Sequence, residues 1–309
     1  MAATSQARVG TLPTEHWRPA RSLWADAWLT FTRDKLAMVG LFMLAFLVLA
    51  VVVGPFLYEH PTGVIDFSIG LEGPSLEHPF GTDDLGRDLL GRILWGGRVS
   101  ITVGITAVAL AITLGMTVGA LAGYFGRLDD PLMRVTDVFL SLPILPLLLV
   151  IIYLFRDSIT QRFGPDVGIF LMIVTVIGIL NWMPVARLVR ASFLSLKNKE
   201  FVEAARCVGD RDGRIIFRHI LPNVLSPVLV AATIGVGGAI LTESTLSFLG
   251  LGFPPDVPTW GRLLFDSQQF LDIAPHWPIF PGLCIFVIVL SINFIGDGLR
   301  DALDPRRKI

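Results

Sequence analysis

Six long apolar runs dominate this sequence, and they constrain the fold more than any other feature. The first run, 36–57, has no charged residue over 22 positions and as an α-helix would reach about 33 Å, enough to cross a bilayer. Its distance from the N-terminus and its lack of a small-residue cleavage site favour an anchor over a signal peptide. We expect an all-α polytopic membrane protein with six transmembrane helices, at 36–57, 99–125, 135–155, 167–189, 224–249 and 277–299.

The amino-acid composition is also that of a membrane protein, and missing sequence motifs exclude several enzyme classes. Charged residues make up 17% of the 309, against about 25% in soluble domains. No lysine follows a glycine, no histidine precedes a glutamate, and no serine has glycines two residues away on both sides. Phosphate-loop, His-Glu-x-x-His zinc and nucleophile-elbow sites are therefore excluded. Cys207 and Cys284 are expected to be packing residues, and any uphill transport needs energy from another chain or an ion gradient.

Basic residues indicate the orientation. With the N-terminus inside, the inner segments hold nineteen Lys and Arg and the outer segments six. Positive residues concentrate on the cytoplasmic side of membrane proteins, so both termini are expected in the cytoplasm. Before the first run, Trp24, Trp28 and Phe31 share one helix face near basic residues, which predicts a helix lying in the membrane interface. A simple linker is the alternative.

A polar, basic stretch separates the fourth and fifth runs. Phe201, Ala205 and Val208 recur there at i, i+4 and i+7, which predicts one face of a short helix. Gly209 allows a sharp turn, and a second helical piece is expected to end before Pro222. Such an amphipathic pair suits insertion into a partner's groove, although an ordinary cytoplasmic loop is the alternative.

Within 191–222, the run Glu203, Ala204, Ala205 is followed after three residues by Gly209 and later by Leu221 and Pro222. By this pattern the stretch resembles the EAA loop of ABC-importer permeases. One residue departs from that pattern, since His219 stands where the family commonly has isoleucine. By the resemblance, the loop contacts an ATPase subunit. The residues that carry the resemblance and the expected ATPase coupling are Glu203, Ala204, Ala205, Gly209, Leu221 and Pro222.

Two further stretches resemble one branch of these permeases. Residues 81–88 are similar to the Gly-Thr-Asp-x-Leu-Gly-Arg-Asp signature of dipeptide and oligopeptide importers, and 278–305 is similar to the end of their C-type subunit. The aspartates of 81–88 lack the spacing of a calcium loop, so no metal site is expected. From the residues alone, we expect a capped helix that begins near Thr82.

The resemblance to the C-type permease subunit of the dipeptide/oligopeptide (Dpp/Opp) family implies a type I ABC importer permease fold. It also implies a second homologous permease, two ATPase subunits that bind ATP and Mg, and an extracytoplasmic solute-binding protein, all in a prokaryotic plasma (inner) membrane. The chain itself would hold no cofactor and would not be an enzyme. Transport would follow alternating access, with peptides as cargo; nickel chelates, glutathione or sugars are alternatives.

Polar and small residues within the runs give weaker predictions. Asn181 and Glu243 are candidates for the translocation path, since polar groups at membrane depth face protein or water. A helix-packing or interfacial role is the alternative for Glu243. Glycines repeat every four residues in the second run and predict close helix packing. They are Gly115, Gly119 and Gly123.

The expected organisation has four parts: a cytoplasmic tail and interfacial helix (1–35), the first transmembrane helix with its extracytoplasmic loop (36–98), a core permease domain with cytoplasmic coupling helices (99–305), and a short tail (306–309). The rival from another class is a stand-alone secondary transporter or channel. It would need a carboxylate deep in a span and often internal repeats, and neither is evident. A membrane-embedded enzyme would need clustered His, Asp or Glu, whereas the five histidines are scattered.

Overall fold

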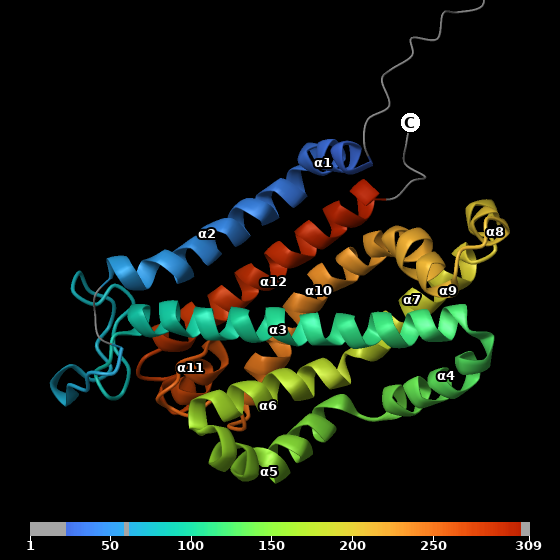
Figure 1. The fold of residues 1–309 in the computed structure, drawn as a ribbon. Coiled ribbons are helices and arrows are strands. Elements are labelled where there is room, and N and C mark those ends of the chain that lie inside the picture. Colours follow the sequence, from blue (N-terminus) through green and yellow to red (C-terminus); the bar gives the residue numbers. More distant parts are fainter. Residues whose placement is uncertain (1–22, 59–61, 304–309) are drawn as a thin grey trace, which may run out of the picture.

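The computed structural model describes residues 23–58 and 62–303, and in these ranges the chain is helical apart from its loops. Figure 1 shows long helices running lengthwise through an elongated bundle. The tails predicted at both ends of the sequence lie mostly outside the described residues. The long helices are α2 (Lys35–Leu57), α3 (Leu89–Tyr124), α4 (Gly126–Ser141), α5 (Ile144–Phe163), α6 (Pro165–Leu180), α7 (Trp182–Leu196), α10 (Leu221–Phe248) and α12 (His276–Leu303).

Shorter helices lie before and between these. At one end of the bundle, the α8 end, the chain forms α8 and the start of the helix that leads into α10 (Figure 1). The opposite end, the loop end, carries residues 62–88 and α11. The short helices are α1 (Leu23–Arg33), η1 (Phe67–Ile69), α8 (Glu200–Cys207), α9 (Asp212–Arg214), η2 (Ile215–Ile220), α11 (Trp260–Ser267) and η3 (Gln268–Phe270).

Helix α3 is the axis of the bundle. It has 36 residues, about 54 Å at 1.5 Å per residue, and it packs against α2, α6, α7 and α10. Gly115, Gly119 and Gly123 face α7, where a β-carbon on Gly119 would lie 2.5 Å from the carbonyl oxygen of Ala186. The glycines thus permit the backbone-to-backbone approach that small residues allow in membrane helices.

The number of spans agrees with the sequence prediction. Among the residues that the structure describes, five helices are long and apolar enough to cross a membrane, and α6 with α7 forms a sixth candidate, bent by 41°. The bend lies at Asn181, three residues before Pro184. Because a proline has no N–H, Pro184 cannot donate to the carbonyl four residues earlier, which weakens the helix at this point.

Three helix boundaries differ from those predicted from the sequence. The expected third span, 135–155, contains Pro143 and Pro146, which predict a kink or a local break in its hydrogen bonding. The break is confirmed at Leu142 and Pro143, where α4 ends and α5 begins, but the predicted bounds of the span are wrong. Residue 142 precedes a proline and is extended, as the clash with the proline ring requires. The bent α6–α7 pair packs beside this break, so two neighbouring spans are both interrupted.

The helix expected near Thr82 begins instead at Leu89. Asp88 is the N-cap, and its Oδ1 accepts from Gly91 N at 2.6 Å, which satisfies one of the free N–H groups of the first turn. Residues 81–87 form a loop.

The helix expected to stop before Pro222 continues through it, from Asp212 to Phe248. Leu221 N donates to Ile216 O, five residues back, and the π-helical turn η2 precedes the proline. A wider turn of this kind lets the hydrogen-bond register shift, and Pro222 then occupies the first turn of α10, where a missing N–H costs little.

The helix predicted before the first apolar run is present as α1, where Ala27 and Phe31 are buried. Phe31 packs on α12 beside Gly298, while Trp28 is exposed and stacks on Phe31 at 6.0 Å between ring centroids. One aromatic ring therefore fixes α1 to the bundle and another faces outward. Placement in the membrane interface remains a prediction.

Candidate functional site

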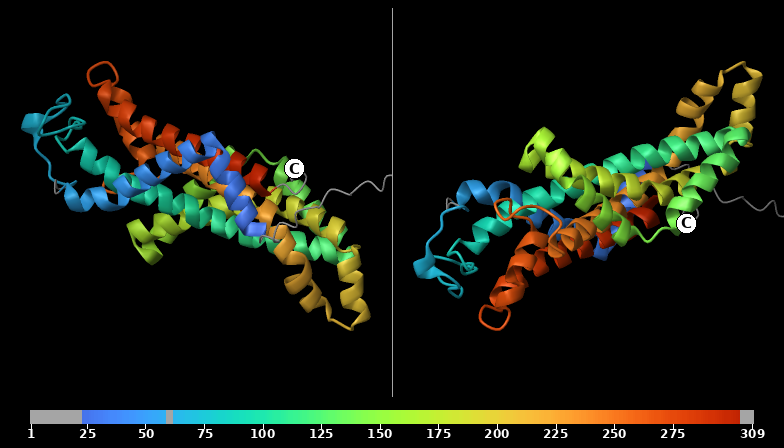
Figure 2. Two further views of the ribbon diagram at one scale, coloured as in Figure 1. Left: turned by 90° about the horizontal axis from the view of Figure 1, so that it is seen from above. Right: turned by 90° about the horizontal axis from the view of Figure 1, so that it is seen from below.

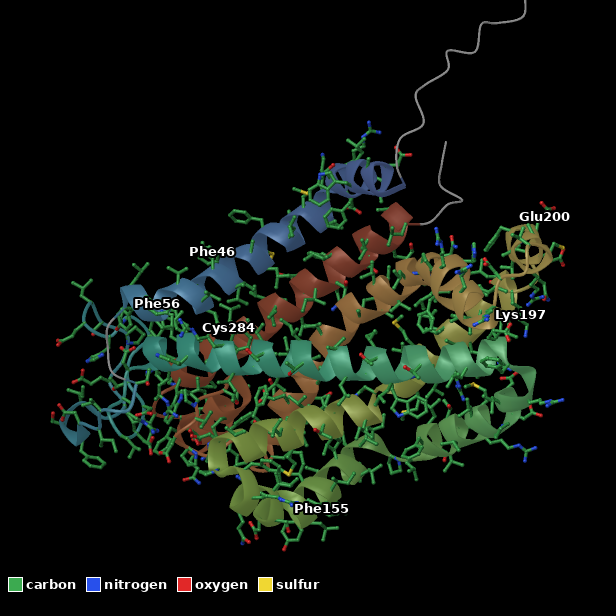
Figure 3. The ribbon with its side chains drawn as sticks, viewed as in Figure 1. Phe46, Phe56, Phe155, Lys197, Glu200 and Cys284 are labelled. Atoms are coloured by element: carbon green, nitrogen blue, oxygen red, sulfur yellow. The ribbon has the colours of Figure 1, made fainter. Side chains whose placement is uncertain are left out.

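Helix α8 and the turn after it form the projection at the α8 end of the bundle (Figure 2). Glu200 and Glu203 lie in the first turn of α8 and Arg206 in its last, which complements the helix dipole at both ends. Figure 3 shows Glu200 at the outer tip and Lys197 closer to the bundle. A short, polar helix is thus held away from the body of the protein.

The apolar face of α8 differs from the predicted one. Val202 and Ala205 are buried, and both pack with Ile215 and Val224, whereas Phe201 and Val208 are exposed. The exposed side also carries Glu203 and Ala204. The helix therefore has apolar residues on two faces, one packed against the protein and one exposed.

Gly209 makes the turn that reverses the chain after α8. Its φ is +90°, a conformation that costs other residues about 1–2 kcal/mol. Asp210 N donates to Ala205 O at 3.0 Å and Gly209 N to Arg206 O at 3.0 Å, the pattern that closes a helix with a left-handed residue. No atom lies within 4 Å of an added β-carbon, so the backbone alone requires glycine.

Asp210 ties the turn to the following helix. Its carboxylate accepts from Arg214 Nη1 at 2.9 Å and pairs with His219 Nε2 at 3.1 Å. The hydrogen bonds from Arg214 and then His219 lower the pKa of Asp210. His219, the residue that departs from the family pattern, therefore has a structural partner that isoleucine could not have.

The same end of α3 is bonded to both sides of this loop. Tyr124, the last residue of α3, donates to Asp212 Oδ1 at 2.6 Å. Lys197 Nζ donates to Gly123 O at 3.0 Å. Movement of the loop is thus linked directly to the longest helix of the bundle.

Asn181 and Glu243 lie in different environments. Asn181 is exposed at the α6–α7 bend, and its Nδ2 donates to Ile177 O at 2.7 Å. Glu243 is fully buried, and its carboxyl accepts from Ser100 Oγ at 3.0 Å and Ser247 Oγ at 2.8 Å. Ser100 Oγ in turn lies 3.3 Å from Trp260 N. Glu243 thus joins α10 to α3 and, through Ser100, to α11.

An apolar cavity of about 600 Å³ lies between α5 and α6 and reaches the α4–α5 break. The side chains around it are almost all apolar, and Thr175 is the polar exception. The lining includes Leu142, Leu147, Phe155, Met172 and Leu180. Figure 3 labels Phe155 on α5, at the lower edge of the bundle.

Within residues 23–58 and 62–303, no three His, Cys, Asp or Glu side chains form a group that could hold a metal ion. Both cysteines are free; Cys207 is exposed on α8, and Cys284 is partly buried on α12.

Two family models match the chain. Residues 111–309 match the binding-protein-dependent transport system inner membrane component, and residues 22–74 match the N-terminal transmembrane domain of oligopeptide transport permease C. The second match covers α1, α2 and the start of the loop that follows. The two models together span most of the sequence.

Known proteins give the same result. The chain is 42% identical over 297 residues, 96% of its length and 94% of the relative's, to the dipeptide transport system permease protein DppC of Alkalihalophilus pseudofirmus. It is 37% identical to the glutathione transport system permease protein GsiD of Pectobacterium atrosepticum, over 98% of both chains.

A solved structure of the inward-facing MetNI methionine ABC transporter aligns with a TM-score of 0.55 and 17% identity, over 70% of this chain and 96% of the other. This likeness concerns the fold and supports the type I permease architecture. The chain belongs to the family of binding-protein-dependent transport system inner membrane components, the permeases of ABC importers.

Proposed function

We propose that this chain is one of two permease subunits in an ATP-driven importer of peptides. A second, homologous permease would form the other half of the path, two ATPase subunits would bind ATP and Mg, and a solute-binding protein would deliver the cargo from outside. The observation that most supports this proposal is that α8 packs against the bundle with one face and exposes the other.

The proposed membrane is the prokaryotic plasma (inner) membrane, with both termini in the cytoplasm. Nineteen of the 25 basic residues then lie on the inner side, as the positive-inside rule requires. In this orientation the α8 end faces the cytoplasm, where an ATPase would reach it, and the loop end faces outward.

The coupling step assigns roles to each residue of the EAA-like loop. Glu203 makes polar contacts with the ATPase and Ala204 permits close approach. Ala205 packs inward against the bundle, and Gly209 sets the turn. Leu221 and Pro222 begin α10 after the π-helical turn, so rotation of α8 is passed to that span. Closure of the ATPase dimer would thereby switch the path from inward to outward.

For the path itself, we propose Asn181, because it is exposed at a bend between two half-helices, the place where transporters expose polar backbone. Glu243 stays a second path candidate, although its complete burial and its two serine partners favour an internal bond. The second permease would cover the apolar α5–α6 cavity.

The cargo is proposed from the relatives. DppC is named for dipeptides and GsiD for glutathione, a tripeptide derivative, which favours short peptides. Nickel chelates and sugars are alternatives within the same architecture. A stand-alone secondary transporter or channel is the alternative of another class.

Co-purification from membranes tests the proposal. We expect a tagged chain to retain an ATPase at one ATPase subunit per permease, and Ala204→Trp on the exposed face of α8 to release it. A matched change at the loop end, Ser75→Trp, should retain it. Purification of a functional transporter with no ATPase, or transport driven by an ion gradient alone, would contradict the proposal and favour the stand-alone transporter.

A further inference from the structure

The end of α3 is hydrogen-bonded to the chain on both sides of α8. Lys197, which precedes α8, donates from Nζ to Gly123 O at 3.0 Å. Asp212, which follows the turn after α8, accepts from the hydroxyl of Tyr124 at 2.6 Å. Gly123 and Tyr124 are the last two residues of α3. The chain on either side of α8 is therefore attached to consecutive residues of one helix.

The two bonds are not equivalent. Lys197 is the C-cap of α7, and α7 already packs along this end of α3, where a β-carbon on Gly123 would lie 2.5 Å from Cβ of Phe193. The bond from Lys197 thus joins two elements that touch anyway. Asp212 begins the helix that continues into α10, so the bond from Tyr124 crosses the turn after α8 and reaches its far side.

The ring of Tyr124 contacts the apolar cluster that holds α8. This cluster contains Val202 and Ala205 of α8 and Ile215 of η2, and Tyr124 is partly buried against it. A tyrosine suits such a position because its ring is apolar while its tip is polar. One side chain of α3 therefore packs beneath α8 and also bonds to the helix that follows it.

The same region leads directly into α4. Phe125 alone separates α3 from α4. Asp129, near the start of α4, accepts from Arg190 of α7 through both carboxylate oxygens, with Nη2 to Oδ2 at 2.7 Å. A two-bonded arginine–carboxylate pair fixes orientation as well as distance. We call residues 123–129 the α3–α4 corner; it joins the end of α3, the start of α4 and, through Asp129, α7.

We infer that Tyr124 is a positioning residue for coupling, whose bond to Asp212 carries movement of α8 to the α3–α4 corner. The inference rests on the proposed function, in which movement of α8 switches the path. Along the chain, α8 leads only to α7 on one side and, through α9 and η2, to α10 on the other. The bond from Tyr124 adds a route across space, which makes α3 and α4 move together with α10.

The bond is of the kind that transmits position. An O–H group that donates to a carboxylate makes a shorter and stronger bond than a neutral pair does, and the 2.6 Å between Tyr124 and Asp212 has that length. Replacement of the tyrosine by phenylalanine removes this bond and keeps the ring in the cluster. The substitution therefore separates the proposed link from the packing of α8.

Reconstituted vesicles test the role, with peptide uptake and ATP hydrolysis measured on the same importer. We expect Tyr124→Phe to retain the ATPase and its rate of hydrolysis, while uptake per ATP falls about three- to tenfold, since one hydrogen bond shifts an equilibrium by about that factor. Asp212→Ala should give the same loss. The double variant should be no worse than either single one, because both changes remove one bond. Asp212→Asn keeps an acceptor oxygen and should recover most of the uptake.

Tyr58→Phe is the matched control. Tyr58 donates to Asp88 at 2.9 Å, and Asp88 caps the opposite end of α3, so the same kind of bond is lost from the same helix. Both tyrosine variants should lower the melting temperature by a similar, small amount, but only Tyr124→Phe should lower uptake per ATP. Tyr153 is 74% exposed on α5, and Tyr153→Phe should change neither quantity.

Amide hydrogen exchange in the purified importer gives a readout of α8 itself. Residues 200–207 should exchange faster in Tyr124→Phe than in Tyr58→Phe, because exchange reports local opening. Equal exchange in the two variants would show that the bond does not hold α8 in position, and would overturn the inference.

The remaining outcomes are distinguishable from one another. Equal uptake per ATP in wild type and Tyr124→Phe overturns the inference, and so does an equal loss of coupling in Tyr58→Phe. Release of the ATPase from Tyr124→Phe also overturns it, because the tyrosine would then belong to the ATPase contact. Absence of ATP-driven uptake in the wild type overturns the proposed function and the inference together, and that result appears before any variant is compared.

Discussion

Arg98 Nε donates to the carbonyl oxygen of Val51 at 3.0 Å, the oxygen that Pro55 leaves without its helical donor. Arg98 Nη2 donates to Val52 O at 2.6 Å, and its guanidinium lies over the rings of Phe56 and Trp95, at 4.9 and 4.7 Å from their centroids. One side chain of α3 thus satisfies the backbone at the proline of α2. An unsatisfied carbonyl in lipid is costly.

Replacing Arg98 should therefore loosen the first span. We expect Arg98→Met to destabilise the protein by about 1–3 kcal/mol, since a buried carbonyl loses its donor, and Arg98→Lys to recover part of this loss. The measurement is thermal unfolding in detergent. Arg162→Met, an exposed arginine at the end of α5, serves as control and should change the melting temperature little; equal effects would show that charge alone matters.

The turn at Gly209 gives a prediction about coupling. Gly209→Val should force a β-branched residue into positive φ, cost more than about 1–2 kcal/mol locally, and reorient α8. We expect ATP hydrolysis to continue with less transport per ATP in reconstituted vesicles. Gly213→Val places the same side chain in equally open space without positive φ and should remain coupled. Normal coupling in both variants would remove Gly209 from its proposed role.

The Asp210 cluster should show a pH dependence. Its folded pKa lies below the ordinary 3.8 because of Arg214 and then His219. The unfolded chain then binds protons more readily, so the stabilisation is fully present above 3.8 and is lost as the pH falls through the lower folded pKa. The melting difference between wild type and Asp210→Asn should be constant from neutral pH to about pH 5 and shrink below 3.8. Asp272→Asn, at an exposed site, is the control, and a difference that grows on acidification would contradict the assignment.

Two glycines, one on α3 and one on α10, predict opposite effects for the same substitution to alanine. Gly119→Ala would place a methyl group 2.5 Å from a backbone oxygen of α7 and should destabilise by about 1–3 kcal/mol through overpacking. Gly238→Ala on α10 meets no atom within 4 Å and should be neutral or stabilising by about 0.5–1 kcal/mol from helix propensity. Unfolding of the two purified variants compares them directly; equal signs would show that α3 and α7 are not in such close contact.

Asn181 and Glu243 can be separated by comparing stability with transport. Glu243→Leu should lower the melting temperature, because Ser100 and Ser247 lose their common acceptor, while Glu243→Gln should retain part of the bonding. Asn181→Leu should leave stability near wild type and change the transport rate. A path role for Glu243 would instead reduce transport in Glu243→Gln at unchanged stability.

Much of the architecture could be predicted without a structure, since lipid admits few solutions for an uncharged run of twenty residues. The run 36–57 is α2 to within one residue at its start. The breaks within the transmembrane helices were harder to predict. Pro143 disfavours a helical conformation at Leu142, and the packing of α4 on α3 and of α5 on α6 then holds the two pieces as separate helices.

The sequence also could not predict which face of α8 packs against the bundle. Phe201, Ala205 and Val208 have the right spacing for one face, yet an eight-residue helix with apolar residues on two sides can turn either side inward. In the structure, Val202 and Ala205 pack into the apolar cluster that contains Ile215 and Val224. Phe201 and Val208 are left outside.

The sequence by itself determined that the chain spans a membrane, and it indicated the family, because hydrophobic length and short motifs are local properties. Only the tertiary structure decided what those motifs do. A buried ion-pair cluster forms where the 81–88 loop meets α3 and α11, and it includes Asp83, Arg87 and Arg92. Glu243 forms an internal hydrogen bond because Ser100 of α3 lies opposite it. Such roles depend on which distant residues are neighbours, and spacing along one chain does not carry that information.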